Sequence, residues 1–80
     1  MYTTVNESRI KNSKDVDVSF KVLQHNFYNE HYIIEVRISD RFIEEHIVNG
    51  TKYLPSKVQE VQNKWLRIIG IIENRKENGV

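Results

Sequence analysis

Two stretches of alternating apolar and polar residues, at 16–22 and 32–38, constrain the fold of this chain more than any other feature. Alternation with a period of two, rich in β-branched side chains, is typical of strands that bury one face. Because the even-numbered positions are apolar in both stretches, even residues must pair with even residues. The sequence therefore predicts an antiparallel hairpin with strands at 16–26 and 30–38.

The length of the connecting loop sets the register of this hairpin. A three-residue loop at 27–29 satisfies the pattern and places Asn29 where a left-handed backbone conformation is favoured. It also places Lys21 opposite Glu35 on the polar face, where opposite charges attract. On the apolar face the predicted pairs are Val22 with Ile34, Phe20 with Val36, and Val18 with Ile38.

The same register brings two histidines together near the loop, His25 and His31. Cross-strand Cβ atoms lie about 4.5–5.5 Å apart, which is close enough for two imidazoles to share a metal ion or to oppose each other's protonation. Zinc usually takes three or four protein ligands, and a third is not evident here. Glu30 and His46 are the nearest candidates. We expect an exposed histidine pair, with a metal site as the alternative.

The polar face of the hairpin also carries an apolar pair, Leu23 and Ile33. An N-terminal segment or another protein should cover it. Residues 2–5 could form a third strand at the edge of the sheet, and we expect residues 1–14 to contain this strand and turns, including one at 6–8.

Residues 41–48 are expected to form a short helix. Asp40 can cap its N-terminus and Gly50 can end it. A strand over the same residues is disfavoured because Glu44 and Glu45 interrupt the alternation. The apolar face of the helix would place His46 at the margin of the core as a hydrogen-bonded structural residue, together with Phe42, Ile43 and Ile47.

A longer helix is predicted at 57–73. Ser56 and Gln59 have the spacing of a capping box, and Pro55 should keep the chain from being helical earlier. A stripe at alternating steps of three and four should be buried: Val58, Val61, Trp65, Ile68 and Ile72. Other apolar residues fall outside the stripe and should form an additional surface: Leu66, Ile69 and Ile71. Residues 67–72 could instead form a final strand, and residues 74–80 are expected to be a disordered polar tail.

These elements predict a single α+β domain at 1–80, with a small antiparallel sheet backed by two helices. The chain has no cysteine, so a disulfide cannot reinforce its small core. Neither a secretory signal nor an apolar membrane span is evident, and we expect a cytoplasmic protein with no membrane partner.

The sequence carries no recognisable catalytic motif. Gly-rich phosphate loops, nucleophile elbows and HExxH metal helices do not occur. On a helix, Glu44 and Glu45 would point about 100° apart, which is a poor arrangement for a pair of catalytic carboxylates. We therefore expect neither an enzyme nor a cofactor.

We expect a protein–protein interaction module, a regulator or inhibitor that occupies a partner's surface. The small core favours self-association or partner binding. One form of such self-association would be a homodimer through the C-terminal helix. The absence of alanine beside ten isoleucines and eight asparagines suggests a low-GC genome, such as that of a phage or mobile element. The candidate contact residues are Leu23, Ile33, Leu66, Ile69 and Ile71.

Nucleic-acid binding is the alternative function. Basic residues on one face of the long helix could contact phosphates, and aromatic residues near the hairpin loop could stack on unpaired bases. The net charge of only +1 argues against it. The candidate residues are Lys52, Lys57, Lys64 and Arg67, with Phe27 and Tyr28.

Overall fold

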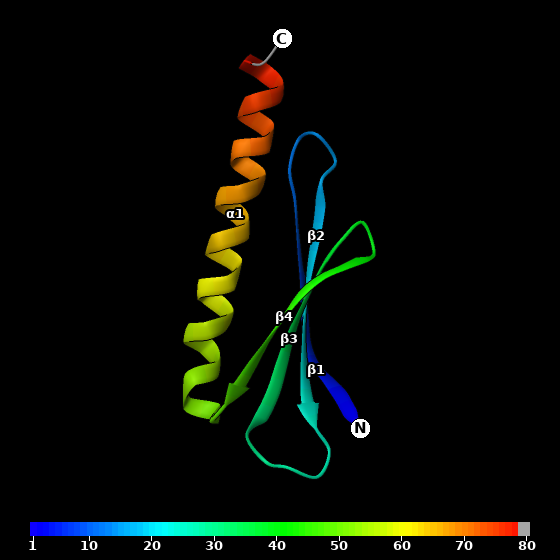
Figure 1. Cartoon of the computed structure of the whole chain (residues 1–80), viewed down its shortest axis with the longest axis vertical. Helices are drawn as coiled ribbons and strands as arrows, with labels where there is room; N and C mark the ends of the chain where they lie inside the picture. The colour runs from blue at the N-terminus through cyan, green and yellow to red at the C-terminus, as the bar shows by residue number, and fades with distance from the viewer. Residues whose placement is uncertain (79–80) are drawn as a thin grey trace.

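The computed structural model describes the backbone of residues 1–78 and the side chains of residues 1–70. Four strands form one antiparallel sheet whose order follows the chain (Figure 1). A 3₁₀ turn, η1, and a helix, α1, follow them, and α1 packs against one face of the sheet. The α+β class is thus confirmed. The elements are β1 (Tyr2–Lys11), β2 (Asp17–His25), β3 (His31–Ile38), β4 (Arg41–Asn49), η1 (Thr51–Tyr53) and α1 (Leu54–Asn78).

The predicted hairpin is confirmed as β2 and β3, with the predicted register: Val22 pairs with Ile34, Phe20 with Val36 and Val18 with Ile38. Its loop differs from the prediction. Glu30, with a φ of 62°, takes the left-handed conformation that we expected at Asn29. The carbonyl of Glu30 accepts a hydrogen bond from the N–H of Gly50 at 2.7 Å, and its carboxylate accepts one from the N–H of Thr51. The end of β4 therefore helps to set the conformation of this loop.

The N-terminal strand is confirmed and is longer than predicted. β1 continues to Lys11, so residues 6–8 lie in the strand and do not form a turn. A shift of register at Val5 separates the pair Thr4–Leu23 from the pair Asn6–Val22. This β-bulge lets β1 stay paired with β2 beyond residues 2–5, the segment predicted to be a strand.

Residues 41–48 form strand β4, so the prediction of a short helix is wrong. Ser39 and Asp40 have φ angles of 51° and 67°, the positive values that tight two-residue hairpin turns require. A shift of register at Ile43 then resets the alternation of β4. Glu44 thereby faces α1, where Lys64 neutralises its charge. The two adjacent glutamates lie on opposite faces of a strand.

Helix α1 begins at Leu54, three residues earlier than predicted. Pro55 is accommodated because the N–H groups in the first turn of a helix have no acceptor within the helix, so the missing N–H costs no hydrogen bond. Ser56 consequently lies inside the helix and is not its cap, and the amide of Gln59 donates to Asn63. The backbone stays helical through residues 67–72, so a final strand there is excluded.

The core lies between α1 and the even-numbered side chains of β2 and β3. The predicted helical stripe is confirmed where its side chains are described: two residues are buried and two are partly buried against the core. Ile69, which we expected at the surface, is only 4% exposed. Ile71, Ile72 and the predicted tail at 74–80 lie outside the residues with described side chains. The buried residues are Val18, Phe20, Val22, Tyr32, Ile34, Val36, Val48, Val61, Trp65 and Ile69.

Candidate functional site

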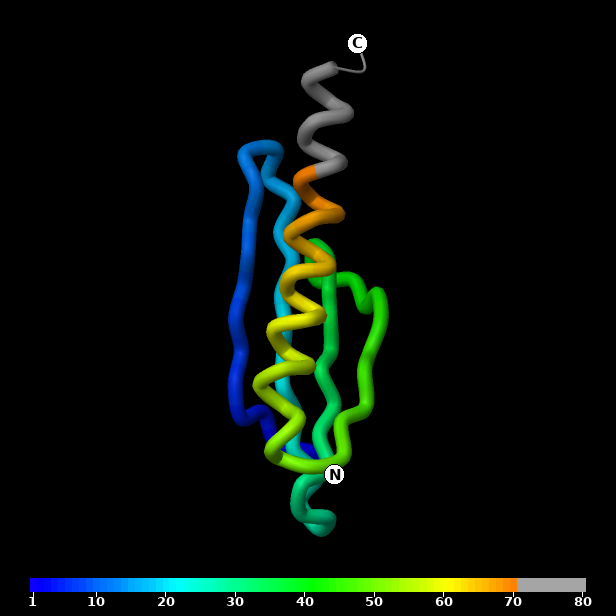
Figure 2. Tube along the Cα trace, turned by 90° about the vertical axis from the view of Figure 1, so that its left-hand side faces the viewer, coloured from blue at the N-terminus to red at the C-terminus, as the bar shows by residue number. Residues whose placement is uncertain are grey.

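The face of the sheet opposite α1 is not covered by any described element (Figures 1 and 2). We call it the open face. Strand pairing aligns three apolar residues in a row across it, because Leu23 pairs with Ile33 and Ile33 with Ile47, and Thr4 pairs with Leu23 at the β1 end. Ile47 is 60% exposed at the end of this row. The predicted pair Leu23 and Ile33 is thus part of a longer apolar row.

A charged row lies beside the apolar row. Lys21 is opposite Glu35, as predicted, but its Nζ lies 3.7 Å from a carboxylate oxygen of Glu7. Glu35 instead accepts a hydrogen bond from Nε of Arg37 at 2.7 Å, which raises the pKa of Arg37. Glu45 has no ion pair within the described residues. The charged row is therefore acidic at its β4 end.

The two histidines lie on the other side of the apolar row, as predicted. Their ring centroids are 5.7 Å apart in an edge-on arrangement. The N–H groups of Phe27 and Tyr28 donate to Nδ1 of His25 at 3.0 and 3.1 Å. Partial desolvation lowers the pKa of His25, and the positive charges of the N-terminus and His31 lower it further. The first role of His25 is thus to hold the loop amides.

This histidine pair is a poor site for a metal ion, because ring nitrogens of both histidines have hydrogen-bond partners. The ring nitrogens of His31 already contact the hydroxyl of Tyr2 at 3.1 Å and the side-chain oxygen of Asn49 at 2.8 Å. Glu30 is bonded to Thr51, and His46 lies on the helix face of the sheet. Within the described residues, no cluster of three or more typical ligands is present.

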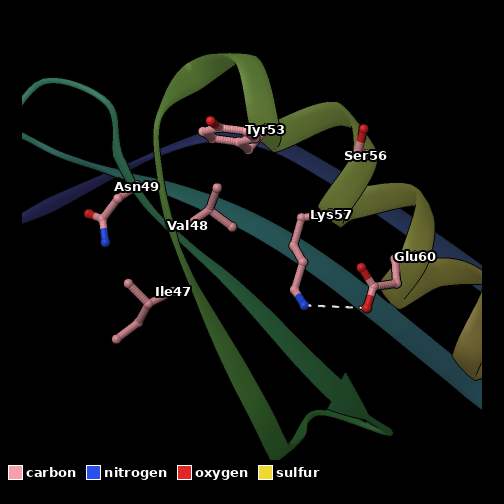
Figure 3. Close-up of a pocket in the computed structure, with 7 residues that line it drawn as sticks. All are labelled: Ile47, Val48, Asn49, Tyr53, Ser56, Lys57 and Glu60. Atoms are coloured by element: carbon pink, nitrogen blue, oxygen red, sulfur yellow. Dashed lines mark hydrogen bonds and ion pairs between the residues drawn. The ribbon is translucent and has the colours of Figure 1, made fainter.

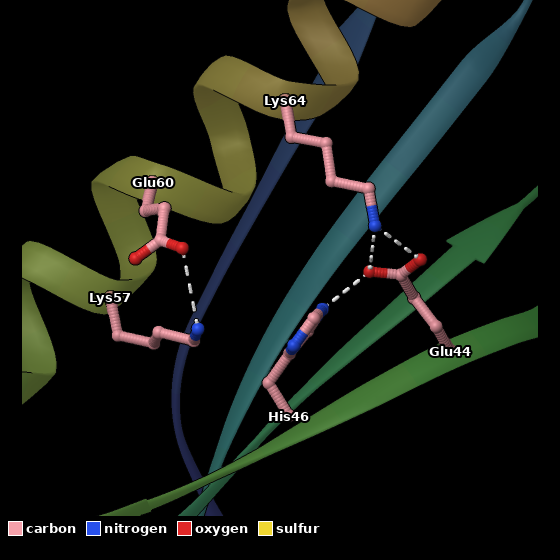
Figure 4. Close-up of polar contacts among 5 residues, drawn as sticks. All are labelled: Glu44, His46, Lys57, Glu60 and Lys64. Atoms are coloured by element: carbon pink, nitrogen blue, oxygen red, sulfur yellow. Dashed lines mark hydrogen bonds and ion pairs between the residues drawn. The ribbon is translucent and has the colours of Figure 1, made fainter.

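A polar cluster missed by the sequence reasoning joins β4 to α1 (Figure 4). Nζ of Lys64 lies 2.9 Å from the carboxylate of Glu44, which also bonds to Nε2 of His46. Partial burial of Glu44 acts to raise its pKa, but the hydrogen bonds from Lys64 and His46 and the positive charge of Lys64 outweigh it, and the pKa is lowered. A carboxylate that stays ionised is suited to an ion pair rather than to general acid catalysis. His46 is therefore a hydrogen-bonded structural residue, as predicted, but on a strand.

The residues proposed for nucleic-acid binding are divided between two places. Phe27 and Tyr28 are 81% and 68% exposed in the loop between β2 and β3, and Lys52 of η1 lies over the ring of Tyr53. Figure 1 shows that this loop and the segment before α1 lie at the same end of the molecule. Lys64 lies farther along α1 and forms an ion pair with Glu44 of β4. The two remaining candidates are Lys57, which contacts Glu60 at 3.4 Å, and Arg67, which is exposed.

Two open cavities flank α1. The first, of about 380 Å³, lies between β4 and the beginning of the helix and is lined by Val48, Tyr53, Lys57 and Glu60 among others (Figure 3). The second, of about 370 Å³, lies on the β1 side and is more apolar. The first cavity holds an ion pair but no grouping of nucleophile, base and oxyanion donor.

The remaining protein-contact candidates are on α1. Leu66 is 49% exposed, in agreement with its predicted position outside the buried stripe. Ile69 belongs to the core, so replacing it with a charged residue is expected to unfold the protein. The surplus apolar surface predicted for α1 is thus reduced, among described side chains, to Leu66.

Comparisons with protein-family models, with curated proteins and with solved structures found no match. Among the described residues, no helix is long and apolar enough to cross a membrane. The function must accordingly be inferred from the surfaces of the molecule.

Proposed function

We propose that this protein is a non-catalytic protein-binding module, a small regulator or inhibitor that occupies a partner's surface with the open face of its sheet. The observation that carries the proposal is the apolar row that ends at Ile47, because the described elements leave it uncovered. Apolar side chains aligned on one face of a small sheet favour burial against a partner.

The charges around the apolar row indicate the chemistry of the partner. Glu7, Glu35 and Glu45 border the row, and Lys21 is the basic residue among them. We expect a partner surface with apolar side chains next to basic ones, since complementary charge steers and orients association. Glu45, which forms no ion pair with any side chain that the structure describes, is the residue best placed to contact such a basic group.

Affinity purification of the tagged chain from its source cells, with and without nuclease, tests the proposal. The variants are Ile33→Glu on the open face and Leu66→Glu on the exposed side of α1 as a matched control. A protein that wild type and Leu66→Glu recover, and that Ile33→Glu loses while remaining folded, would support the open face as the binding surface. Equal recovery by all three chains would contradict it.

Nucleic-acid binding remains a second candidate because the exposed Phe27 and Tyr28 share one end of the molecule with Lys52. Binding of this kind should weaken steeply as salt is raised. A labelled single-stranded oligonucleotide titrated at several salt concentrations tests it. Phe27→Ala with Tyr28→Ala should weaken stacking at the tip, and Lys64→Glu with Arg67→Glu tests the face of α1.

A further inference from the structure

β4 forms one edge of the sheet, and its outward-facing backbone groups can be identified. The N–H of Gly50 donates to the carbonyl of Glu30, which shows that Gly50 faces β3. Because the direction alternates along a strand, the backbone groups of Asn49, Ile47 and Glu45 face away from β3. Within residues 1–78 these groups make no backbone hydrogen bond to another element, so they are free to pair with another strand.

The two edge strands, β1 and β4, differ in how well they are protected against the addition of another strand. β1 carries the bulge at Val5 and the basic residues Arg9 and Lys11, which are features that discourage the addition of a strand. β4 is regular from Glu44 to Asn49, and its own shift of register lies at the far end of the strand. The β4 edge is therefore the one that favours pairing.

We propose that a second copy of this chain pairs with β4 in antiparallel orientation, with a two-fold axis at Ile47, and joins the two sheets into one. A two-fold interface must be self-complementary, because the same surface is used by both copies. This requirement can be tested against each register that aligns the outward-facing residues.

β4 meets the requirement of self-complementarity in the register centred on Ile47. It places Glu45 opposite Asn49 of the second copy, where an amide can meet a carboxylate. A register centred on Glu45 would place two glutamates opposite each other, which is destabilising. A register centred on His46 would bring the bulge at Ile43 into the ladder, and registers centred on Val48 or Asn49 would bring in the turn residue Thr51.

Both faces of the joined sheet gain contacts from this register. On the open face, Ile47 meets Ile47 of the second copy, so the apolar row continues across the interface. On the other face, His46 of the second copy lies opposite Val48, which lines the cavity of about 380 Å³ beside β4 (Figure 3).

The position of α1 is compatible with this pairing. In Figure 2 the helix lies over the middle of the sheet, with β1 along one side and β4 along the other. The outward edge of β4 is thus left clear by the described elements. The proposed dimer is held by the backbone of this edge, whereas the proposed protein-binding function is tested at Ile33 on the open face. Ile47 belongs to both surfaces, so the Ile33→Glu and Ile47→Pro variants distinguish failure of one proposal from failure of the other.

Sedimentation equilibrium of the full chain over a range of concentrations tests the dimer. Ile47→Pro removes an outward N–H without removing a β3–β4 hydrogen bond, and Ile47→Lys places two charges at the axis. We expect a wild-type dimer and folded monomers for both variants, with folding checked by circular dichroism. Leu66→Lys, on an exposed part of α1, should remain dimeric. A monomeric wild type, or a dimer that only Leu66→Lys dissociates, would overturn the proposal.

A cross-linking experiment tests the register. The chain has no cysteine, and Cα atoms in a hydrogen-bonded antiparallel pair lie about 5.5 Å apart, within the range of a disulfide. Ile47→Cys should therefore form a covalent dimer on mild oxidation much faster than Leu66→Cys. Equal rates for the two variants, or no covalent dimer of Ile47→Cys, would exclude an axis at this residue.

Discussion

His25 lies at the end of β2, where one ring nitrogen accepts hydrogen bonds from the N–H groups of Phe27 and Tyr28. A proton on that nitrogen would break both contacts. It would also add a positive charge beside His31 and the N-terminus, which already lower the pKa of His25. At the scale of single residues, the histidine pair thus makes the hairpin tip sensitive to pH.

We predict that acid destabilises the protein through His25. Because its pKa is lowered by folding, the folded state binds fewer protons than the unfolded chain, so stability falls as pH falls below about 6.5, the unfolded pKa. The contribution is fully present above that pH. His25→Gln, which keeps an acceptor oxygen but does not titrate, should show a smaller loss of melting temperature between pH 8 and pH 5.

His31→Gln is the matched control in the same thermal melts. It removes one positive neighbour of His25 but keeps the Nδ1 contacts with the loop. If wild type and His25→Gln lose stability in parallel as the pH falls, another group is responsible.

At the scale of elements, the turn before β4 decides what residues 41–48 become. Ser39 and Asp40 both have positive φ, and this turn directs the chain back along β3. N–H of Ser39 donates to the carbonyl of Asp17, and Arg37 donates to the carbonyl of Asp40. These contacts hold the turn in a conformation that is costly for residues with a Cβ atom.

The double substitution Ser39→Asn with Asp40→Gly is predicted to stabilise the protein by about 1 kcal/mol. Asparagine and glycine relieve the cost of positive φ in a two-residue hairpin turn. Urea denaturation should show a higher midpoint with an unchanged slope. A helix starting at residue 41 would instead lose its Asp40 cap, and the substitution would then be destabilising.

At the scale of the whole molecule, α1 and the sheet are joined by an apolar core and by the polar cluster at Lys64. Gln62 also donates to Ser8 of β1, and Asn12 donates to the carbonyl of Ile69. The helix is thus tied to both sides of the sheet, while the elements described for residues 1–78 leave the open face uncovered.

Lys64→Met is predicted to lower the free energy of unfolding by about 1 kcal/mol, because it removes the cation that compensates the partly buried Glu44. Lys57→Met is a matched control on the same helix, since its partner Glu60 is largely exposed, and it should change stability by less than about 0.5 kcal/mol. Chemical denaturation of the two variants checks both values. Equal effects would show that the contact with Glu44 does not hold α1 to β4.

The sequence alone determined the central hairpin, its register and the stripe of α1, because both periodicities are local and one face of each element must be buried. Only the tertiary structure decided the identity of β4. Its alternation is interrupted by a bulge, and Glu44 can face the helix only because Lys64, twenty residues later, supplies a charge. The extent of β1 and the burial of Ile69 were decided in the same way, by pairing with β2 and by packing on the sheet. On the open face, the sequence predicted the apolar pair Leu23 and Ile33. The place of Ile47 beside them was decided by the pairing of β4 with β3.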